Sequence, residues 1–221
     1  MDPYNKKNTP FQKHEVEDYE RKRYRGLDQK IVDAREHSIL NRFLNTINKK
    51  NLKVLDVPCG YGRFSAILSG FCDYLVNSDI SYHMVERAGE RKTSLPPGFV
   101  AGAVADTKQG IPFQPNSFEL VFSMRFFHHV HSSEERKNIL SEFYRVSENW
   151  LILSFYRSNF LHFIQRKLRR KVKKSSTRIS MISFQEFKSE IQDAGFRIVK
   201  ISPLIRGLHA QHIVFMKKDQ N

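Results

Sequence analysis

The sequence contains little of what marks several common classes of protein. It has two cysteines in 221 residues, Cys59 and Cys72, which excludes a disulfide-rich secreted scaffold and a four-cysteine zinc site. No apolar run approaches the roughly 18 residues that cross a bilayer, and the polar N-terminus lacks the apolar core of a secretion signal. We therefore expect a protein of the reducing cytoplasm, without a structural metal site.

Core material and positive charge are both plentiful. Hydrophobic residues make up 40% of the chain and include 18 phenylalanines, and the length suits one large domain. We expect residues 1–20 to form a flexible arm, because charge and proline are scattered through them, and residues 21–221 to form the domain. The net charge of +14 predicts attraction to an anionic membrane, to nucleic acid or to phosphorylated substrates.

Apolar runs of strand length alternate with helical segments along the domain. The predicted strands cover residues 53–57, 73–79, 99–106, 118–124, 150–155, 196–202 and 212–216, and the helices cover residues 19–48, 63–68, 81–91, 133–146 and 183–194. Strands that are joined through helices form a parallel sheet covered on both faces. The last two strands have no helix between them, so we expect them to pair as an antiparallel hairpin at the sheet edge. The predicted class is α/β with three layers.

A glycine-containing turn follows the first predicted strand. In the segment Asp56-Val-Pro-Cys-Gly60-Tyr-Gly62, the two glycines allow the backbone to approach a ligand where a Cβ would clash. In open α/β sheets, ligands bind beyond the carboxyl ends of the strands. A dinucleotide-binding turn needs a third glycine at position 65, which is Ser65, so the sequence disfavours a dehydrogenase.

Acidic residues end the first three predicted strands: Asp56, Asp79 and Asp106. A carboxylate after the second strand can accept hydrogen bonds from ribose hydroxyls, and one beside a purine can accept a bond from an exocyclic amine. A single aspartate at such a place is more often a turn or helix cap. Three in succession, with the glycine turn first, favour a nucleoside-containing ligand.

Taken together, these motifs resemble those of the class I S-adenosylmethionine-dependent methyltransferases. The residues that carry the resemblance are Val54-Leu-Asp-Val-Pro-Cys-Gly-Tyr-Gly-Arg63, Asn77-Ser-Asp79-Ile-Ser81, Ala105-Asp106, and Ile111-Pro-Phe-Gln-Pro-Asn-Ser-Phe-Glu-Leu-Val-Phe-Ser123 with Phe126-Phe-His-His-Val130. The resemblance covers about residues 50–156. It implies a Rossmann-like sheet of seven strands, mostly parallel with the last one antiparallel, and S-adenosylmethionine as the cofactor.

The resemblance also implies a set of cofactor contacts. Asp56, Gly60 and Gly62 would hold the methionine end, Asp79 the ribose, and Ile80, Ala105 and Asp106 the adenine. The neighbouring Pro58, Cys59 and Met124 complete the expected cofactor site. One departure from the family pattern is visible, because Pro58 stands where the first glycine is usual, and proline has no N–H to donate.

His128 and His129 are the candidates for a general base. They follow the fourth predicted strand, where the family places residues near the transferred methyl group, and histidine titrates near neutral pH. A base is needed only when the acceptor arrives protonated. The alternative is that one histidine packs under the sheet while the other caps the next helix. Arg125 is a candidate for binding an acceptor carboxylate or phosphate.

Two further segments are open to more than one interpretation. Glu20 to Arg25, with Tyr24, form either a flap over the cofactor or a solvated helix start. Cys59 lies in the cofactor loop, but no base stands beside it in the sequence, so a nucleophilic role is disfavoured.

A basic segment, expected as an insert or cap over residues 156–182, interrupts the pattern of strands and helices. Between residues 157 and 178 it contains nine Lys or Arg and no acidic residue, and Phe160, Ile164, Leu168 and Val172 form an apolar stripe at helical spacing. Three interpretations stay open: a helix at an anionic membrane surface, a polyanion site such as RNA, or a helix that docks on the domain with its charges solvated. Nucleic acid is the less favoured partner, because no RNA-binding motif is present.

The favoured function is methyl transfer to a small-molecule or lipid-linked acceptor, by a protein that is cytoplasmic or peripheral at the membrane. RNA or protein methylation is an alternative. The asparagine-proline-proline-aromatic motif of enzymes that methylate amino groups of nucleic acids is missing, since Ser123-Met-Arg-Phe126 stands there. A non-catalytic cofactor-binding adaptor is a third hypothesis, and the intact Asp56, Asp79 and Asp106 argue against it.

Overall fold

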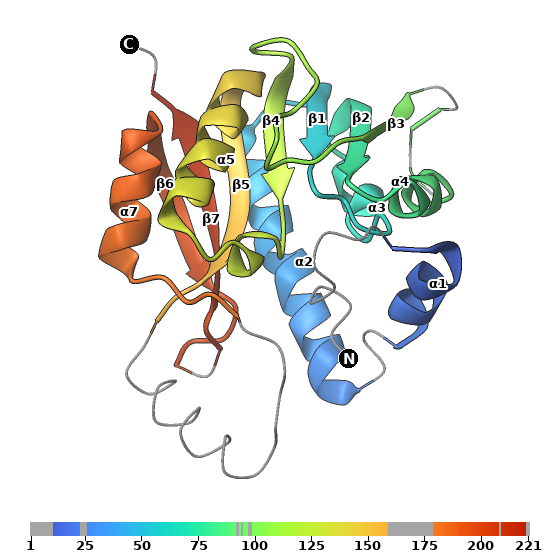
Figure 1. Cartoon of the computed structure of the whole chain (residues 1–221), viewed down its shortest axis with the longest axis horizontal. Helices are drawn as coiled ribbons and strands as arrows, with labels where there is room; N and C mark the ends of the chain where they lie inside the picture. The colour runs from blue at the N-terminus through green and yellow to red at the C-terminus, as the bar shows by residue number, and fades with distance from the viewer. Residues whose placement is uncertain are drawn as a thin grey trace.

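The computed structural model describes residues 11–22, 26–91, 93, 95–96, 99–158, 179–207 and 209–219. Seven strands form one sheet in the order β3-β2-β1-β4-β5-β7-β6, and Figure 1 shows helices on both of its sides. The strands are β1 (Leu52–Asp56), β2 (Cys72–Asp79), β3 (Val100–Val104), β4 (Phe118–Ser123), β5 (Ser147–Tyr156), β6 (Phe196–Pro203) and β7 (Gln211–Lys218). The predicted three-layer, Rossmann-like α/β fold is confirmed.

Pairing directions follow from the way the chain connects its strands. The pairs β1–β2, β1–β4, β2–β3 and β4–β5 are parallel, since a helix or a long connection separates each strand from its neighbour. The strand β7 runs antiparallel to both β5 and β6. The hairpin of the last two strands is as predicted, and β7 enters the sheet between β5 and β6, so that β6 forms the edge.

Helices α2 (Leu27–Ile47), α3 (Ser65–Leu68) and α4 (Tyr82–Gly89) belong to one layer, and α5 (Ser133–Val146) and α7 (Phe184–Asp193) to the other. In Figure 1, α5 and α7 lie in front of the sheet and α2 lies behind it. Serine side chains cap three of the helices: Ser81 accepts from the N–H of Met84, Ser132 from Glu135 and Ser183 from Glu186.

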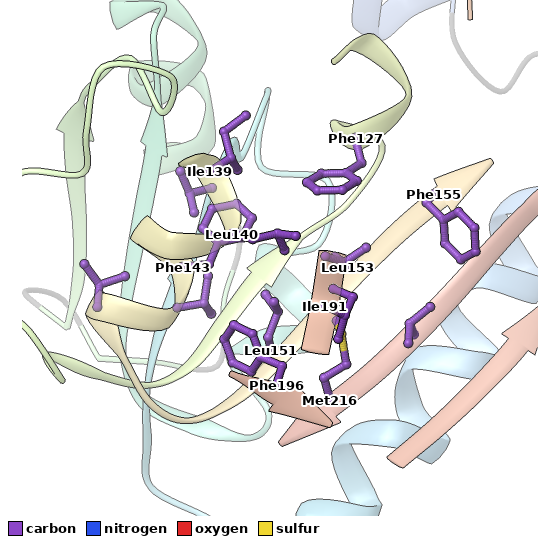
Figure 2. Packing of buried hydrophobic residues seen from close by; sticks show 14 of the residues in the cluster. Phe127, Ile139, Leu140, Phe143, Leu151, Leu153, Phe155, Ile191, Phe196 and Met216 are labelled. Carbon is purple, nitrogen blue, oxygen red and sulfur yellow. The ribbon is translucent and has the colours of Figure 1, made fainter. Parts of the chain in front are cut away.

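Two apolar clusters fill the space between the layers. Figure 2 shows part of the cluster beneath α5 and α7, where Ile139, Leu140 and Phe143 of α5 face the side chains of β5, including Leu151 and Leu153. On the opposite face, α2 packs its apolar stripe on β1 and β4. Strands that are buried on both faces, such as β4 and β5, read as continuous apolar runs.

The N-terminal part differs from the sequence prediction. Residues 13–20, expected in a flexible arm, belong to the helix α1 (Lys13–Lys22), and the helix expected over residues 19–48 is divided between α1 and α2. The reason is that Val16 is buried against Tyr61 and Met84, while Glu20 forms ion pairs with Arg87 and Arg91. A single buried valine among charged residues gave too weak a periodic signal.

The two ends of the basic segment are joined by backbone hydrogen bonds after β5. The N–H of Ile182 donates to the carbonyl of Tyr156, and the N–H of Ser158 donates to the carbonyl of Ile182, each at 2.9 Å. Residues 159–178, which carry the expected amphipathic helix, lie outside the described residues.

Candidate functional site

The site lies where the order of the strands reverses. From β1 the sheet continues to β2 and β3 on one side and to β4 and β5 on the other. Loops that leave the carboxyl ends of β1 and β4 therefore diverge, and such a point is where open α/β sheets bind ligands. Asp56, Asp79 and Met124 all lie at this edge.

The two glycines of the loop after β1 have different surroundings. Both have positive φ, 54° for Gly60 and 73° for Gly62, a conformation that favours glycine. A Cβ on Gly62 would lie 2.7 Å from the Cα of Ala88 in α4, whereas a Cβ on Gly60 would meet nothing within 4 Å. Gly62 thus allows close packing of α4, whereas Gly60 leaves open space beside its Cα. Whether either backbone approaches a ligand stays a prediction.

Asp79 connects the end of β2 to the loop after β1. Its Oδ2 accepts from the N–H of Gly60 and its Oδ1 from the N–H of Ser81, each at 3.0 Å. Burial raises the pKa of Asp79 to about 6, although the backbone N–H groups of Ser81, Gly60 and Ile80 oppose the rise. The carboxylate is therefore held in place, and it is only partly stabilised in its charged form.

Asp56 is the more deeply buried of the two carboxylates, with 1% of its surface exposed. Its Oδ2 has no hydrogen-bond partner in the part of the chain that the structure describes. Burial, and then the charge of Asp79, raise the pKa of Asp56 well above its ordinary value. A buried carboxyl without a partner is costly, and a cationic group supplied by a ligand would relieve that cost. These two carboxyl groups and the open face of Gly60 fit a ligand with hydroxyl and ammonium groups.

The residues expected around an adenine lie at the ends of β2 and β3. Ile80 exposes 43% of its surface, which is unusual for a large aliphatic residue at a sheet edge. The N–H of Ala105 donates to the carbonyl of Asp79 at 3.0 Å. Asp106 caps its own turn, because its Oδ1 accepts from the N–H of Lys108 at 3.0 Å, as in the turn alternative.

A pocket of about 70 Å³ joins the loop after β1 to the segment after β4. One side is formed by Pro58, Cys59, Gly60, Tyr61, Arg63 and Phe64, the other by Met124, Arg125, Phe126 and His129, and Tyr19 of α1 contributes as well. Six of the sequence-predicted or candidate residues thus meet in one hollow.

The two histidines occupy different environments. His129 lines the pocket, whereas His128 is buried. The ring of His128 lies 4.0 Å from that of His129 and 4.7 Å from that of Tyr156, measured between centroids. The alternative of a helix-capping histidine does not hold, because Ser132 caps α5. Of the pair, His129 is the one that lines the pocket.

Cys59 and the expected flap also have defined surroundings. Burial, with the charges of Asp79 and Asp56, raises the pKa of the Cys59 thiol well above its ordinary value, which opposes a nucleophilic role. Glu20 contacts Arg87 and Arg91, and the ring of Tyr19 lies 5.9 Å from that of Tyr61. The end of α1 therefore covers the loop after β1, while residues 23–25 lie outside the described part of the chain.

One functional group was missed by the sequence prediction. Glu36 of α2 is fully buried and contacts Arg63, Arg125 and Gln211. A sequence signal existed, because Glu36 lies on the same helical stripe as the apolar Ile39, Leu40 and Phe43. A charge on such a stripe needs a partner from elsewhere in the fold.

Comparison with known proteins agrees with this geometry. Residues 55–149 match the family model described as "Methyltransferase domain", and no curated protein matches the sequence. A magnesium protoporphyrin IX methyltransferase from Synechocystis, solved with bound SAH, has a TM-score of 0.71, with 19% identity over 88% of each chain. An S-adenosylmethionine-dependent methyltransferase from Aquifex aeolicus has a TM-score of 0.65, with 18% identity over 95% of this chain and 100% of that one.

A third solved structure, a possible histamine N-methyltransferase from Thermotoga maritima, has a TM-score of 0.60, with 18% identity over 94% of this chain and 97% of that one. At these identities the likeness shows the fold. The match to the family model adds the domain type, and it runs from the end of β1 through β4, so that it includes the loops after β1 and β4. Residues 55–149 thus form a methyltransferase domain, and the chain has the fold of S-adenosylmethionine-dependent methyltransferases.

Proposed function

We propose that the chain transfers a methyl group from S-adenosylmethionine to a small-molecule or lipid-linked acceptor in the pocket beside β4. The observation that carries the proposal is that one pocket is lined both by the loop after β1 and by the segment after β4. A donor held by the first and an acceptor held by the second would meet there. The donor supplies a methyl group on a cationic sulfur, so the protein mainly contributes alignment and a dry site.

We assign the donor contacts to the residues that the geometry makes suitable. Oδ2 of Asp56 is buried and has no hydrogen-bond partner among the described residues, so this carboxylate would bind the ammonium group of the methionine end. Asp79 would accept from the ribose hydroxyls, and Ile80 with Ala105 would cover the adenine. Gly60 leaves the space in which the methionine end of S-adenosylmethionine would lie. Pro58, Cys59 and Met124 would complete the wall.

The acceptor side of the pocket is formed by four residues after β4, and one of them is a candidate base. Phe126 and His129 line the pocket with Met124 and Arg125. His129 would take the proton from a hydroxyl or amine acceptor, and an acceptor that arrives deprotonated would need no base. The buried His128 would hold the ring of His129 in place.

The lipid-linked form of the proposal draws on an exposed apolar face of α2. Leu27 and Ile31 expose 80% and 56% of their surfaces. Because Glu36 of the same helix contacts Arg125 just after β4, residues 27–31 extend past the carboxyl edge of the sheet. Arg157, the first of the nine basic residues, follows β5 at that edge. Together these features would suit an anionic membrane surface. Among the described residues no helix is long and apolar enough to span a membrane.

Two experiments test the proposal. A radiolabelled methyl-transfer assay on fractionated cell extract should label a metabolite or lipid pool, and label that appears only in RNA or protein would contradict it. For the membrane surface, charge reversal of Lys167, Arg169 and Arg170 should abolish retention on liposomes that contain phosphatidylserine. Unchanged retention would favour a basic segment that docks on the domain.

A further inference from the structure

A buried carboxylate lies between the two halves of the pocket. Glu36 has 0% of its surface exposed and belongs to the middle of α2, outside the sheet. Its Oε2 accepts from Nη2 of Arg63 at 2.5 Å, and its Oε1 accepts from Nε of Arg125 at 2.8 Å and from Nε2 of Gln211 at 2.6 Å. Three donors from three separate elements thus converge on one side chain.

The charge on Glu36 is retained at neutral pH. Burial opposes its ionisation, but the charges and hydrogen bonds of Arg125 and Arg63 outweigh the burial, so the pKa of Glu36 lies below its ordinary value. Removing one member of such a buried group leaves the charges of the others without compensation, which is strongly destabilising. The group therefore favours one fixed arrangement of its members.

Arg125 is held at both its backbone and its side chain. Its φ of 58° is uncommon for a residue other than glycine, because in this conformation the Cβ comes too close to the backbone. The backbone N–H donates to Oγ of Ser154 at 2.8 Å, while Nε donates to Glu36. Met124 and Phe126 on either side of it line the pocket. Strain of this kind persists where neighbouring contacts determine the conformation, and it concentrates at functional sites.

Arg63 connects the same carboxylate to the donor side. It follows Gly62 directly, and its Nε donates to Oδ1 of Asp33 at 2.9 Å, so two acidic residues of α2 hold one guanidinium. Arg63 also lines the pocket. The loop after β1 and the turn after β4 are therefore fixed to the same face of α2.

We propose that Glu36 is a positioning residue, which aligns the donor loop with the acceptor wall through Arg63 and Arg125. Glu36 lies outside the pocket lining, so it acts through the two arginines. The proposal rests on the function proposed above, because that function defines which side of the pocket binds the donor and which binds the acceptor. The contacts of Glu36 with the two arginines are a property of the fold. The competing possibility is a buried ion pair that contributes stability alone.

The chain offers a matched control for stability. Glu190 of α7 is equally buried, and its carboxylate binds Arg136 of α5 through Nε at 2.9 Å and Nη2 at 2.7 Å, in the other helical layer. Glu36→Gln and Glu190→Gln each remove one buried charge that is paired with arginine. A second control is Asp33→Asn, which loosens Arg63 and leaves the contact of Glu36 with Arg125.

The test measures amide hydrogen exchange and the affinity for S-adenosylhomocysteine, well below the melting temperature of each variant. Glu36→Gln should accelerate exchange in both residues 57–64 and residues 123–130 and weaken the affinity about tenfold. Asp33→Asn should accelerate exchange in residues 57–64 alone, and Glu190→Gln should change neither segment. Glu36→Asp, which keeps the charge and shortens the side chain, should show a smaller effect on both segments, and it replaces Glu36→Gln if that variant does not fold.

The proposal is overturned if exchange in the two segments and the affinity change no more in the Glu36 variants than in Glu190→Gln. Acceleration confined to α2 would overturn it as well, because that result indicates a local contribution to stability. If the wild-type protein takes up no S-adenosylhomocysteine, the proposed function fails, and the exchange data still decide whether Glu36 joins the two segments.

Discussion

The carboxylate of Asp79 accepts a hydrogen bond from the backbone N–H of Gly60 at 3.0 Å. This bond links the end of β2 to the one position of the glycine turn that leaves open space. A ligand that fills this space would therefore meet a carboxylate already fixed in position. The arrangement has a cost, since burial raises the pKa of Asp79.

Replacing Asp79 should stabilise the protein while it weakens donor binding. The folded-state pKa of about 6 lies above the ordinary value of 3.8, so the folded chain binds the proton more tightly than the unfolded chain does. The free energy of unfolding should then fall as pH rises from about 4 to 6. At pH 7 a pKa shift of this size destabilises the folded chain by about 3 kcal/mol. The substitution removes this penalty, but it also removes a charge-assisted hydrogen bond, which offsets roughly 1 kcal/mol of the gain. Urea unfolding of Asp79→Asn at pH 7 should show a gain of about 2 kcal/mol, which disappears at pH 4. A loss of stability at pH 7 would refute this account of the carboxylate.

Affinity for the donor product should rise with pH. Asp79 binds hydroxyl and cationic groups best when it is ionised, and with a pKa of about 6 its ionised fraction rises from pH 5 to pH 7. We expect S-adenosylhomocysteine to bind about tenfold more tightly at pH 7 than at pH 5. Calorimetry at several pH values measures the affinity. In the control variant Asp79→Asn, the affinity should no longer change with pH in this range. An affinity that is constant over this range would contradict the assignment of Asp79.

The two glycines should respond differently to alanine. Gly62→Ala places a Cβ at 2.7 Å from the backbone of Ala88, so overpacking adds to backbone strain, and we expect a loss of roughly 2–4 kcal/mol of stability. Gly60→Ala meets no neighbour and should lose only about 1–2 kcal/mol, while the affinity for S-adenosylhomocysteine falls at least tenfold. Thermal unfolding and calorimetry of both variants provide the comparison. Equal losses of affinity in two folded variants would show that Gly60 has no special contact with the donor.

His129 should matter for transfer and not for donor binding. Because it lines the pocket beside Phe126, His129→Ala should lower methyl transfer roughly 100-fold if the acceptor must lose a proton, with the affinity for S-adenosylhomocysteine nearly unchanged. The assay uses the cell fraction that the wild-type protein labels. The buried His128 serves as the comparison, since His128→Ala should mainly lower the melting temperature. Transfer by His129→Ala within threefold of wild type would exclude this histidine as the base.

The sequence predicted the elements whose signals are local. Alternating apolar runs identified the strands, and the serine caps with the glycine stop located α7 closely, because capping and periodicity act over a few residues. Asp56 and Asp79 became site candidates for a similar reason, since each ends a predicted strand, and Gly60 became one because it belongs to the turn after the first strand. The insertion of β7 between β5 and β6 was not foreseen, because strand order depends on contacts between distant segments.

The missed features depend on tertiary contacts. The structured end of the N-terminal arm depends on ion pairs between Glu20 and α4, and the role of Glu36 depends on Arg125, which lies 89 residues away in the chain. Gly62 looked equivalent to Gly60 because both follow the same turn pattern. The two positions differ only in the structure, where Ala88 of α4 leaves no room for a Cβ on Gly62.

The central claim is that the carboxyl edge of β1 and β2 binds the S-adenosyl group. Calorimetric titration of the purified wild-type protein with S-adenosylhomocysteine at pH 7.5 tests it most directly. We expect one site with a dissociation constant near the micromolar range, about −8 kcal/mol, and at least a tenfold weaker site in Gly60→Ala. A folded wild-type protein that releases no binding heat and shows no rise in melting temperature at millimolar ligand would contradict the claim.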